Sequence, residues 1–176
     1  MAKNQMKLSD LKRYLNSLSQ DELVNEIAVL FGKLDTVRDY YQAKLNPAGD
    51  EQVVAKYKAI IEKEFFPARG FGKLNLSVAK KAIADCRKIC RNPASSIDVM
   101  LFYVEQGVKF INSYGDIKES FYVSGEIVYE DALKLIVEHE WQEMFRDRCR
   151  KIVTRSSDSG YGFHDQLSYV YRTYLS

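Results

Sequence analysis

The chain has 176 residues, a formal net charge of +2 and a hydrophobic fraction of 46%. With a mean hydropathy of -0.33, this composition is typical of a globular protein and argues against a disordered or a membrane-spanning chain. The small net charge excludes nucleic-acid binding through bulk electrostatics, so any such case must come from local patches. At this length we expect a single domain over residues 1–176.

The start of the chain and its cysteines bear on the compartment. Residues 1–15 contain no unbroken apolar run as long as a signal peptide or a transmembrane helix. The three cysteines are an odd number without a secretory signal, which favours reduced thiols over disulfides. We therefore predict a cytoplasmic protein that does not bind a membrane.

Three amphipathic helices are predicted in the N-terminal part of the chain. Ser9 is the expected N-cap of the first helix, and Ser19 and Glu22 form a capping box that starts the second. A third helix ends at Asn46 and Pro47. The second helix has apolar residues at helical spacing, namely Leu23, Ile27, Leu30, Phe31 and Leu34.

Two further helices with a glycine-bearing loop between them are predicted next. The first covers residues 50–66, and the second covers residues 77–91. When the second helix is projected at 100° per residue, Cys86 and Cys90 fall on its apolar side. Its other side is basic and carries Lys80, Lys81, Arg87, Lys88 and Arg91.

Residues 93–112 are predicted to form the central helix of the fold. One apolar row consists of Ile97, Met100, Leu101, Val104, Val108 and Ile111, and a second of Val99, Phe102, Tyr103 and Phe110. A helix with two apolar rows must be covered from more than one direction, so we expect it to be buried. Asn92 as N-cap, Pro93 at the first helical position and Gly115 after the last turn mark its ends.

The last third of the chain is predicted to be helical with breaks. A helical turn begins with a capping box of Asp116 and Glu119 and is interrupted at Ser124 and Gly125. The sequence does not decide whether residues 126–155 form one helix or two, because no Gly or Pro near residue 139 marks a break. A final helix is expected over about residues 163–175.

These elements define the predicted fold class. No run alternates apolar and polar residues between turn signals, so the chain is predicted to be all-α, with about eight amphipathic helices. The short connections favour antiparallel helix pairs around the central helix. Both a compact bundle and a curved superhelix of stacked pairs satisfy this pattern.

The cysteines and histidines are the first candidates for chemistry. Cys86 and Cys90 stand at i, i+4, and with Cys149, His139 or His164 they have the residue types of a zinc site. All three cysteines lie within apolar stripes, where a free cysteine behaves as a small apolar residue. We therefore predict core packing, and neither a metal nor another cofactor.

One end of the predicted fold brings several polar residues together. In an up-and-down arrangement alternate connections share an end, so the loop with Arg69 and Lys73 should lie near the turn with Tyr114 and Asp116. His164 joins them if the chain bends near residue 139. This edge is the predicted anion or ligand site if there is one; the loop lacks the spacing of a nucleotide-binding loop, and a plain connection between helices is the favoured interpretation.

Two basic helix faces are candidates for phosphate contacts. They lie on residues 80–91 and 146–155, and solvated helix surfaces are the alternative reading of both. The residues assigned to phosphate contacts are Lys80, Arg87, Lys88, Arg91, Arg146 and Arg150.

Three strings resemble a known family: EFFPARGFGKLNLSVAKKAI, MLFYVEQGVKFINSYGDIKESFY and GYGFHDQL. The chain resembles, over nearly its whole length, a family of small helical bacterial proteins classed as a domain of unknown function. The resemblance implies a bacterial, cytoplasmic, helical protein, and it implies no activity, ligand or catalytic residue.

The first functional hypothesis is a helical module that binds another protein without catalysis, because amphipathic helices dominate the chain. Tyr169, Tyr171 and Tyr174 of the last helix are candidates for such a surface. The alternative is nucleic-acid binding through the two basic faces. A third hypothesis is an enzyme at the edge with Arg69, Asp116 and His164.

Overall fold

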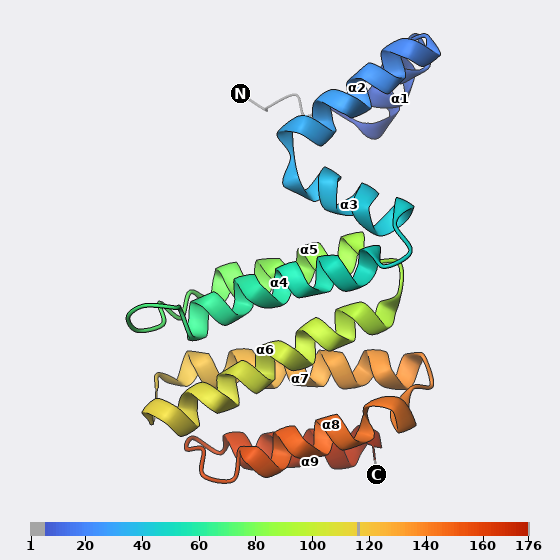
Figure 1. Ribbon diagram of the computed structural model, residues 1–176. Helices are drawn as coiled ribbons and strands as arrows, with labels where there is room; N and C mark the ends of the chain where they lie inside the picture. Colours follow the sequence, from blue (N-terminus) through green and yellow to red (C-terminus); the bar gives the residue numbers. More distant parts are fainter. Residues whose placement is uncertain (1–5, 116, 176) are drawn as a thin grey trace, which may run out of the picture. The chain divides into compact units, whose positions relative to one another are not determined.

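The computed structural model describes residues 6–115 and 117–175, and these residues form nine helices and no strand (Figure 1). The all-α fold class is therefore confirmed. The helices are α1 (Leu8–Leu15), α2 (Gln20–Lys33), α3 (Asp35–Leu45), α4 (Gly49–Phe65), α5 (Leu76–Ile89), α6 (Pro93–Tyr114), α7 (Glu119–Glu138), α8 (Gln142–Arg155) and α9 (Phe163–Leu175).

Contacts between residues divide the chain into two compact units, with the boundary after Tyr41 inside α3. The first unit holds α1, α2 and most of α3. The second unit holds the end of α3 and helices α4 to α9, and it contains the hydrophobic core. The expectation of one domain over residues 1–176 stays a prediction. The two alternatives for the helix arrangement, a compact bundle and a curved superhelix, also stay predictions.

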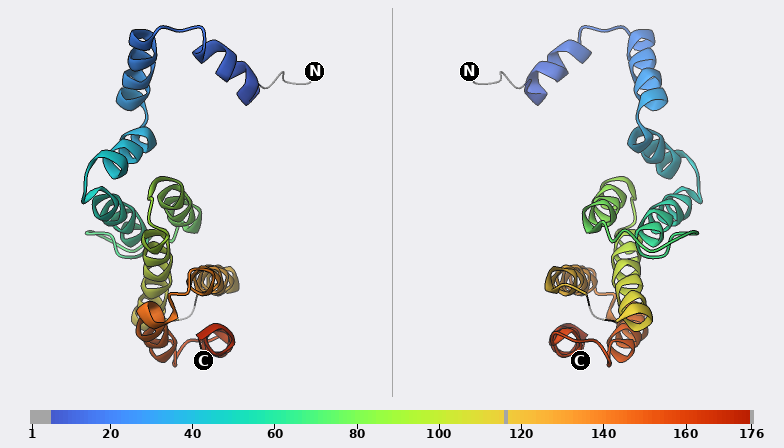
Figure 2. Two further views of the ribbon diagram at one scale, coloured as in Figure 1. Left: turned by 90° about the vertical axis from the view of Figure 1, so that its right-hand side faces the viewer. Right: turned by 90° about the vertical axis from the view of Figure 1, so that its left-hand side faces the viewer.

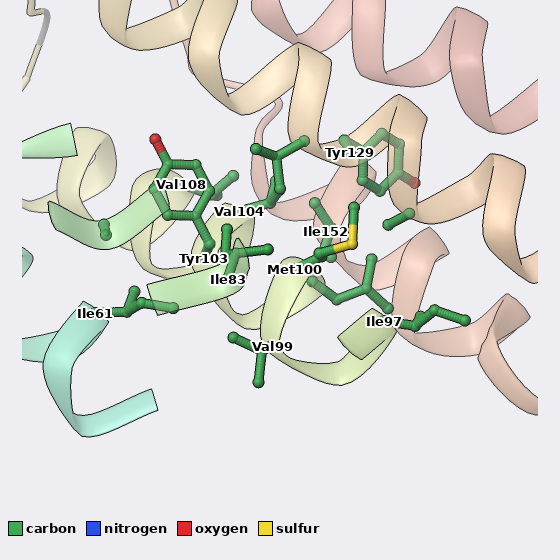
Figure 3. Close-up of a cluster of buried hydrophobic side chains, with 14 of the residues drawn as sticks. Ile61, Ile83, Ile97, Val99, Met100, Tyr103, Val104, Val108, Tyr129 and Ile152 are labelled. Atoms are coloured by element: carbon green, nitrogen blue, oxygen red, sulfur yellow. The ribbon is translucent and has the colours of Figure 1, made fainter. Parts of the chain in front are cut away.

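Helix α6 is the centre of the second unit. It packs against α4 and α5 on one side and against α7 and α8 on the other (Figures 1 and 2). Ile97 and Leu101 are fully buried. In Figure 3 the α6 side chains lie among Ile61 of α4, Ile83 of α5 and residues of α7 and α8. The prediction of a buried central helix is confirmed, because its two apolar rows meet different neighbours.

The ends of α6 follow the local sequence. Asn92 Oδ1 accepts a hydrogen bond from the Ala94 backbone N–H at 3.0 Å, and Pro93 occupies the first turn. Gly115, at φ 82°, ends the helix in a conformation that few other residues adopt. The helix therefore extends to Tyr114, two residues beyond the predicted end.

Helix α7 is continuous where the sequence predicted an interruption. Ser124 is buried, and its Oγ lies 2.8 Å from the Tyr103 hydroxyl of α6. A Cβ atom at Gly125 would lie 3.0 Å from Cζ of Phe163, the first residue of α9. The predicted break is wrong because the small residues are needed for close helix packing and not for a turn. Asp116 of the predicted capping box lies outside the described residues.

Residues 126–155 belong to two helices. Helix α7 ends at Glu138 and α8 begins at Gln142. Glu140 adopts φ 58°, a left-handed conformation that turns the chain, and the rings of His139 and Trp141 stack 4.7 Å apart. A non-glycine residue makes this bend, so no Gly or Pro marks it in the sequence.

Gly125→Val should lower the free energy of unfolding by about 1–3 kcal/mol, because added side-chain atoms would overlap the buried Phe163 ring. Urea denaturation followed by helical circular dichroism measures this. Gly32→Val in α2 is the matched control, since nothing lies within 4 Å of a Cβ there. Equal stability of the two variants would contradict the close approach of α7 and α9.

Candidate functional site

The structure places the loop with Arg69 and Lys73 beside Tyr114, and it places His164 at a different position in the second unit. Arg69 and Lys73 line a cavity of about 380 Å³ between the loop after α4 and the start of α5. Tyr114 is half-exposed, and its ring lies 4.8 Å from that of Phe71 in the same loop. His164 lines a different cavity, next to Val153 of α8, and Asp116 lies outside the described residues. A common site for these five residues stays a prediction.

The loop with Arg69 and Lys73 folds back on the end of α4. The Leu74 N–H donates to the Glu64 carbonyl at 3.0 Å. A Cβ atom at Gly72 would lie 2.2 Å from the Phe65 carbonyl oxygen, so only glycine fits there. The glycine at position 72 is thus needed for close backbone packing.

His164 connects α8 to α9. Its Nδ1 lies 3.1 Å from the Val153 carbonyl oxygen and 3.1 Å from Ser156 Oγ, while Nε2 lies 3.4 Å from Ser168 Oγ. A carbonyl oxygen can only accept, so the contact with Val153 requires the proton on Nδ1. This arrangement holds the ring in place between two helices.

The two predicted basic faces differ in how many of their charges are paired. On α5, Lys81 pairs with Asp85, whereas the exposed side chains of Lys80, Arg87 and Lys88, and of Arg91 two residues after the helix, have no acidic partner among the described residues. On α8, Arg146 pairs with Glu143 at 3.1 Å and Arg150 with Asp147 at 2.7 Å. The α5 face therefore keeps more unpaired positive charge than the outer face of α8.

The cysteines lie in or at the edge of the core. Cys86 and Cys149 are buried, Cys90 is half-buried, and the sulfur atoms of Cys86 and Cys90 are 3.5 Å apart. The hydrogen bond with Cys90, together with burial, raises the pKa of Cys86, and burial raises the pKa of Cys149 to about 12. Among the described residues, no three His, Cys, Asp or Glu side chains are grouped as metal ligands.

Ellman's reagent should react rapidly with Cys90 alone in the folded protein and with all three cysteines in urea, because Cys86 and Cys149 are buried thiols. Cys90→Ser should remove the rapid reaction; if the rapid reaction persists, the burial of the other thiols is contradicted.

The raised pKa of Cys149 also predicts a loss of stability at high pH. As pH rises, the Cys149 thiol ionises in the unfolded chain before it ionises in the folded protein, so the folded state should lose stability between about pH 8.5 and 12.

An ion-pair network, not predicted from the sequence, joins α4, α6 and α8. The Arg148 guanidinium donates to both carboxylate oxygens of Glu105, with Nε to Oε1 at 2.7 Å and Nη2 to Oε2 at 2.9 Å. It also donates to Asp98, which accepts from Lys58 Nζ at 2.7 Å. Burial alone would lower the pKa of Arg148, but the Glu105 and Asp98 interactions outweigh it and raise this pKa.

Beside this network, α6 and α8 enclose a groove of about 540 Å³. Glu105 meets Arg148 at one end, and Asn112 Nδ2 donates to the Arg155 carbonyl oxygen at 2.8 Å at the other. The residue numbers of both helices increase along the groove, so the helices run in the same direction here. We name this cavity the α6–α8 groove; its lining comprises Glu105, Gln106, Val108, Lys109, Asn112, Ser113, Arg148, Lys151, Ile152 and Arg155.

A sequence signal for this groove was present in the central helix. Polar residues interrupt its apolar pattern at Glu105, Lys109 and Asn112, which share one face at i, i+4 and i+7. Arg148, Lys151 and Arg155 show the same type of spacing in α8. The spacing marks two polar stripes, but it does not indicate that they face each other.

The N-terminal unit has a different kind of candidate site. Neither α1 nor α2 contains a buried residue, although both are amphipathic. The predicted capping box at the start of α2 is confirmed, with the Ser19 N–H donating to Glu22 Oε2 at 2.7 Å. Three apolar residues of α2 and the Leu34 C-cap, which we together name the α2 face, are 40–47% exposed: Ile27, Leu30, Phe31 and Leu34.

A family model described as a family of unknown function matches residues 6–174, nearly the whole chain. The chain belongs to this family, DUF6155. Membership of DUF6155 confirms the family of unknown function indicated by the sequence motifs, whereas a bacterial origin stays a prediction. A search of curated proteins and a search of solved structures returned no match.

The helices also bear on the membrane prediction for this DUF6155 member. Among the described residues, no helix is both long enough and apolar enough to cross a bilayer. The cytoplasmic location stays a prediction.

Proposed function

We propose that this chain is a helical interaction module that binds another protein through the α2 face. The supporting observation is that Ile27, Leu30 and Phe31 form one apolar face of α2 although they are 40–43% exposed, and that Leu34, directly after the helix, is 47% exposed. The i, i+3, i+4 spacing of the three helical residues is that of a helix whose apolar side lies in the groove of a partner.

The length of these helices supports the same conclusion. Helix α1 has 8 residues and α2 has 14, and isolated helices of such lengths are marginal in water. Packing of an apolar face normally supplies the missing stability, at about 1.5–3 kcal/mol for each large side chain that becomes buried. A groove on a partner provides such packing.

The charges of α2 specify the chemistry of the partner. Asp21, Glu22 and Glu26 give the first two turns a negative charge. Complementarity therefore calls for an apolar groove whose rim carries Lys or Arg next to the start of α2. Charge complementarity of this kind increases the association rate and sets the orientation of the bound helix.

A photo-crosslinking experiment followed by reconstitution tests this proposal. A benzophenone amino acid at Val24, which borders the α2 face and is 60% exposed, captures proteins in native lysate. The captured protein is identified and purified, and its affinity for the full chain is measured by calorimetry. Ile27→Glu with Phe31→Glu should weaken binding at least about 100-fold, because two charges would enter an apolar groove.

Tyr169→Glu is the matched control, since Tyr169 is 62% exposed on α9, in the other unit. It should leave the affinity unchanged. The proposal would be overturned if crosslinks formed only within a single chain. It would also be overturned if the purified partner bound the double variant as tightly as the unchanged chain.

Nucleic-acid binding is the second candidate, and the α5 face supports it. The exposed Lys80, Arg87, Lys88 and Arg91 have no acidic partner among the described residues. Fluorescence anisotropy of short DNA and RNA at low salt tests this candidate. Binding should weaken as salt rises, with a log–log slope of about -3 to -4 for four phosphate contacts. Absence of binding at low salt would eliminate it.

A further inference from the structure

The α6–α8 groove holds three cations that no acid neutralises. Lys109, Lys151 and Arg155 line it, their side chains are exposed, and none has an acidic partner among the described residues. Lys109 Nζ lies 4.3 Å from the Phe66 ring centroid, which positions the lysine without removing its charge. Lys151 and Arg155 are one helical turn apart and therefore neighbours on α8.

The acid that lines the groove is already bound. Glu105 accepts two hydrogen bonds from Arg148, so this pair contributes no net charge. The remaining lining keeps the positive charges of Lys109, Lys151 and Arg155. Clustered cations of this kind favour a phosphate group, which can accept from several donors at once.

Gln106 provides an independent sign of a ligand. This α6 residue lines the groove and is 8% exposed, and its Oε1 has no hydrogen-bond partner among the described residues. A buried amide oxygen without a donor costs free energy. A hydroxyl or amino group of a bound molecule would supply the missing donor if the amide turns toward the groove, because almost none of the Oε1 surface is exposed.

We propose that the α6–α8 groove binds a small phosphate ester that also carries a hydroxyl or amino group. The phosphate lies against Lys109, Lys151 and Arg155, and the donor group reaches Gln106 Oε1. Val108 and Ile152 give the groove apolar walls, and its volume of about 540 Å³ suits a sugar phosphate or a mononucleotide. The site is separate from the α2 face, so it does not depend on the proposed function.

Isothermal titration calorimetry on the full chain tests this proposal with ribose 5-phosphate and adenosine monophosphate. Ribose, adenosine and inorganic phosphate are the comparison ligands. At least one of the two esters should bind with a Kd at or below about 1 mM, and its counterpart without phosphate should bind at least about tenfold more weakly. Failure of both esters to bind would overturn the proposal.

Two variants separate the contacts. Lys151→Gln with Arg155→Gln should weaken ester binding at least about tenfold, because it removes the phosphate donors. Lys12→Gln with Lys33→Gln removes the same charge from exposed positions in the N-terminal unit and should leave binding unchanged. Equal losses in both double variants would indicate a nonspecific charge effect and contradict the site.

Gln106→Leu tests the second half of the proposal. It should weaken binding of the ester while leaving inorganic phosphate binding unchanged, with an unaltered helical circular dichroism spectrum as the control for folding. If Gln106→Leu leaves ester binding unchanged, or if inorganic phosphate binds as tightly as the ester, Gln106 does not contact the ligand and the proposal is wrong. The proposal would also be wrong if a DNA or RNA oligonucleotide bound more tightly than either ester and the Lys151→Gln, Arg155→Gln double variant lost that binding.

Discussion

Phe110→Ala should lower the free energy of unfolding by about 3–5 kcal/mol, since it removes a large side chain that is 1% exposed. Its ring lies within 6.3 Å of the rings of Phe65, Phe66, Phe71 and Tyr114, measured between centroids. The variant leaves a cavity where α6 meets α4 and the loop after it. Urea denaturation monitored by circular dichroism measures the loss.

Phe71→Ala is the matched control, because it makes the same substitution at the edge of the same aromatic cluster. Phe71 is 60% exposed, so truncation leaves a surface notch that water fills. We expect a loss below about 1 kcal/mol. If both variants lose the same stability, Phe110 is not the buried contact between these elements.

Arg148→Met should lower the free energy of unfolding by about 2 kcal/mol. The variant leaves Glu105 without a partner and Asp98 with Lys58 alone, and a partly buried carboxylate without a partner costs free energy. The side chains of all three residues are 27–30% exposed, so solvent reduces the loss below that of a fully buried pair. Thermal and urea denaturation measure the difference.

Two controls separate charge from packing in this variant. Adding Glu105→Gln to Arg148→Met removes the unpaired charge and should recover most of the lost stability, while Asp98 keeps its pair with Lys58. Arg150→Met breaks the exposed pair with Asp147 on α8, where the two side chains are 64% and 75% exposed, and should cost less than about 0.5 kcal/mol. No recovery in the double variant would mean that the methionine packs badly.

The Arg148 network also bears on the α6–α8 groove. Because Arg148 neutralises Glu105, the groove does not present a carboxylate to an incoming anion. Lys151 and Arg155 lie on the same face of α8 one and two turns further on, without an acidic partner among the described residues. One face of α8 therefore contributes both to the fold and to the proposed binding site.

The sequence alone determined the helical class and the central position of α6. Both depend on local patterns: Asn92, Pro93 and Gly115 set the ends of α6, and two apolar rows require cover on two sides. Ser19 and Glu22 likewise determine the start of α2 within four residues of chain. Capping hydrogen bonds and apolar periodicity extend over only one or two helical turns, so they can be predicted without knowing which element packs against the helix.

Only the tertiary structure decided the features that depend on which surfaces meet. Gly125 signals a break when read locally, but opposite Phe163 it permits close packing inside a continuous helix. Arg148 belongs to a basic stretch in the sequence, and it becomes an ion-pair partner only because α6 brings Glu105 and Asp98 beside it. Residues 43 and 50 positions apart in the chain make these contacts, so no local pattern specifies them.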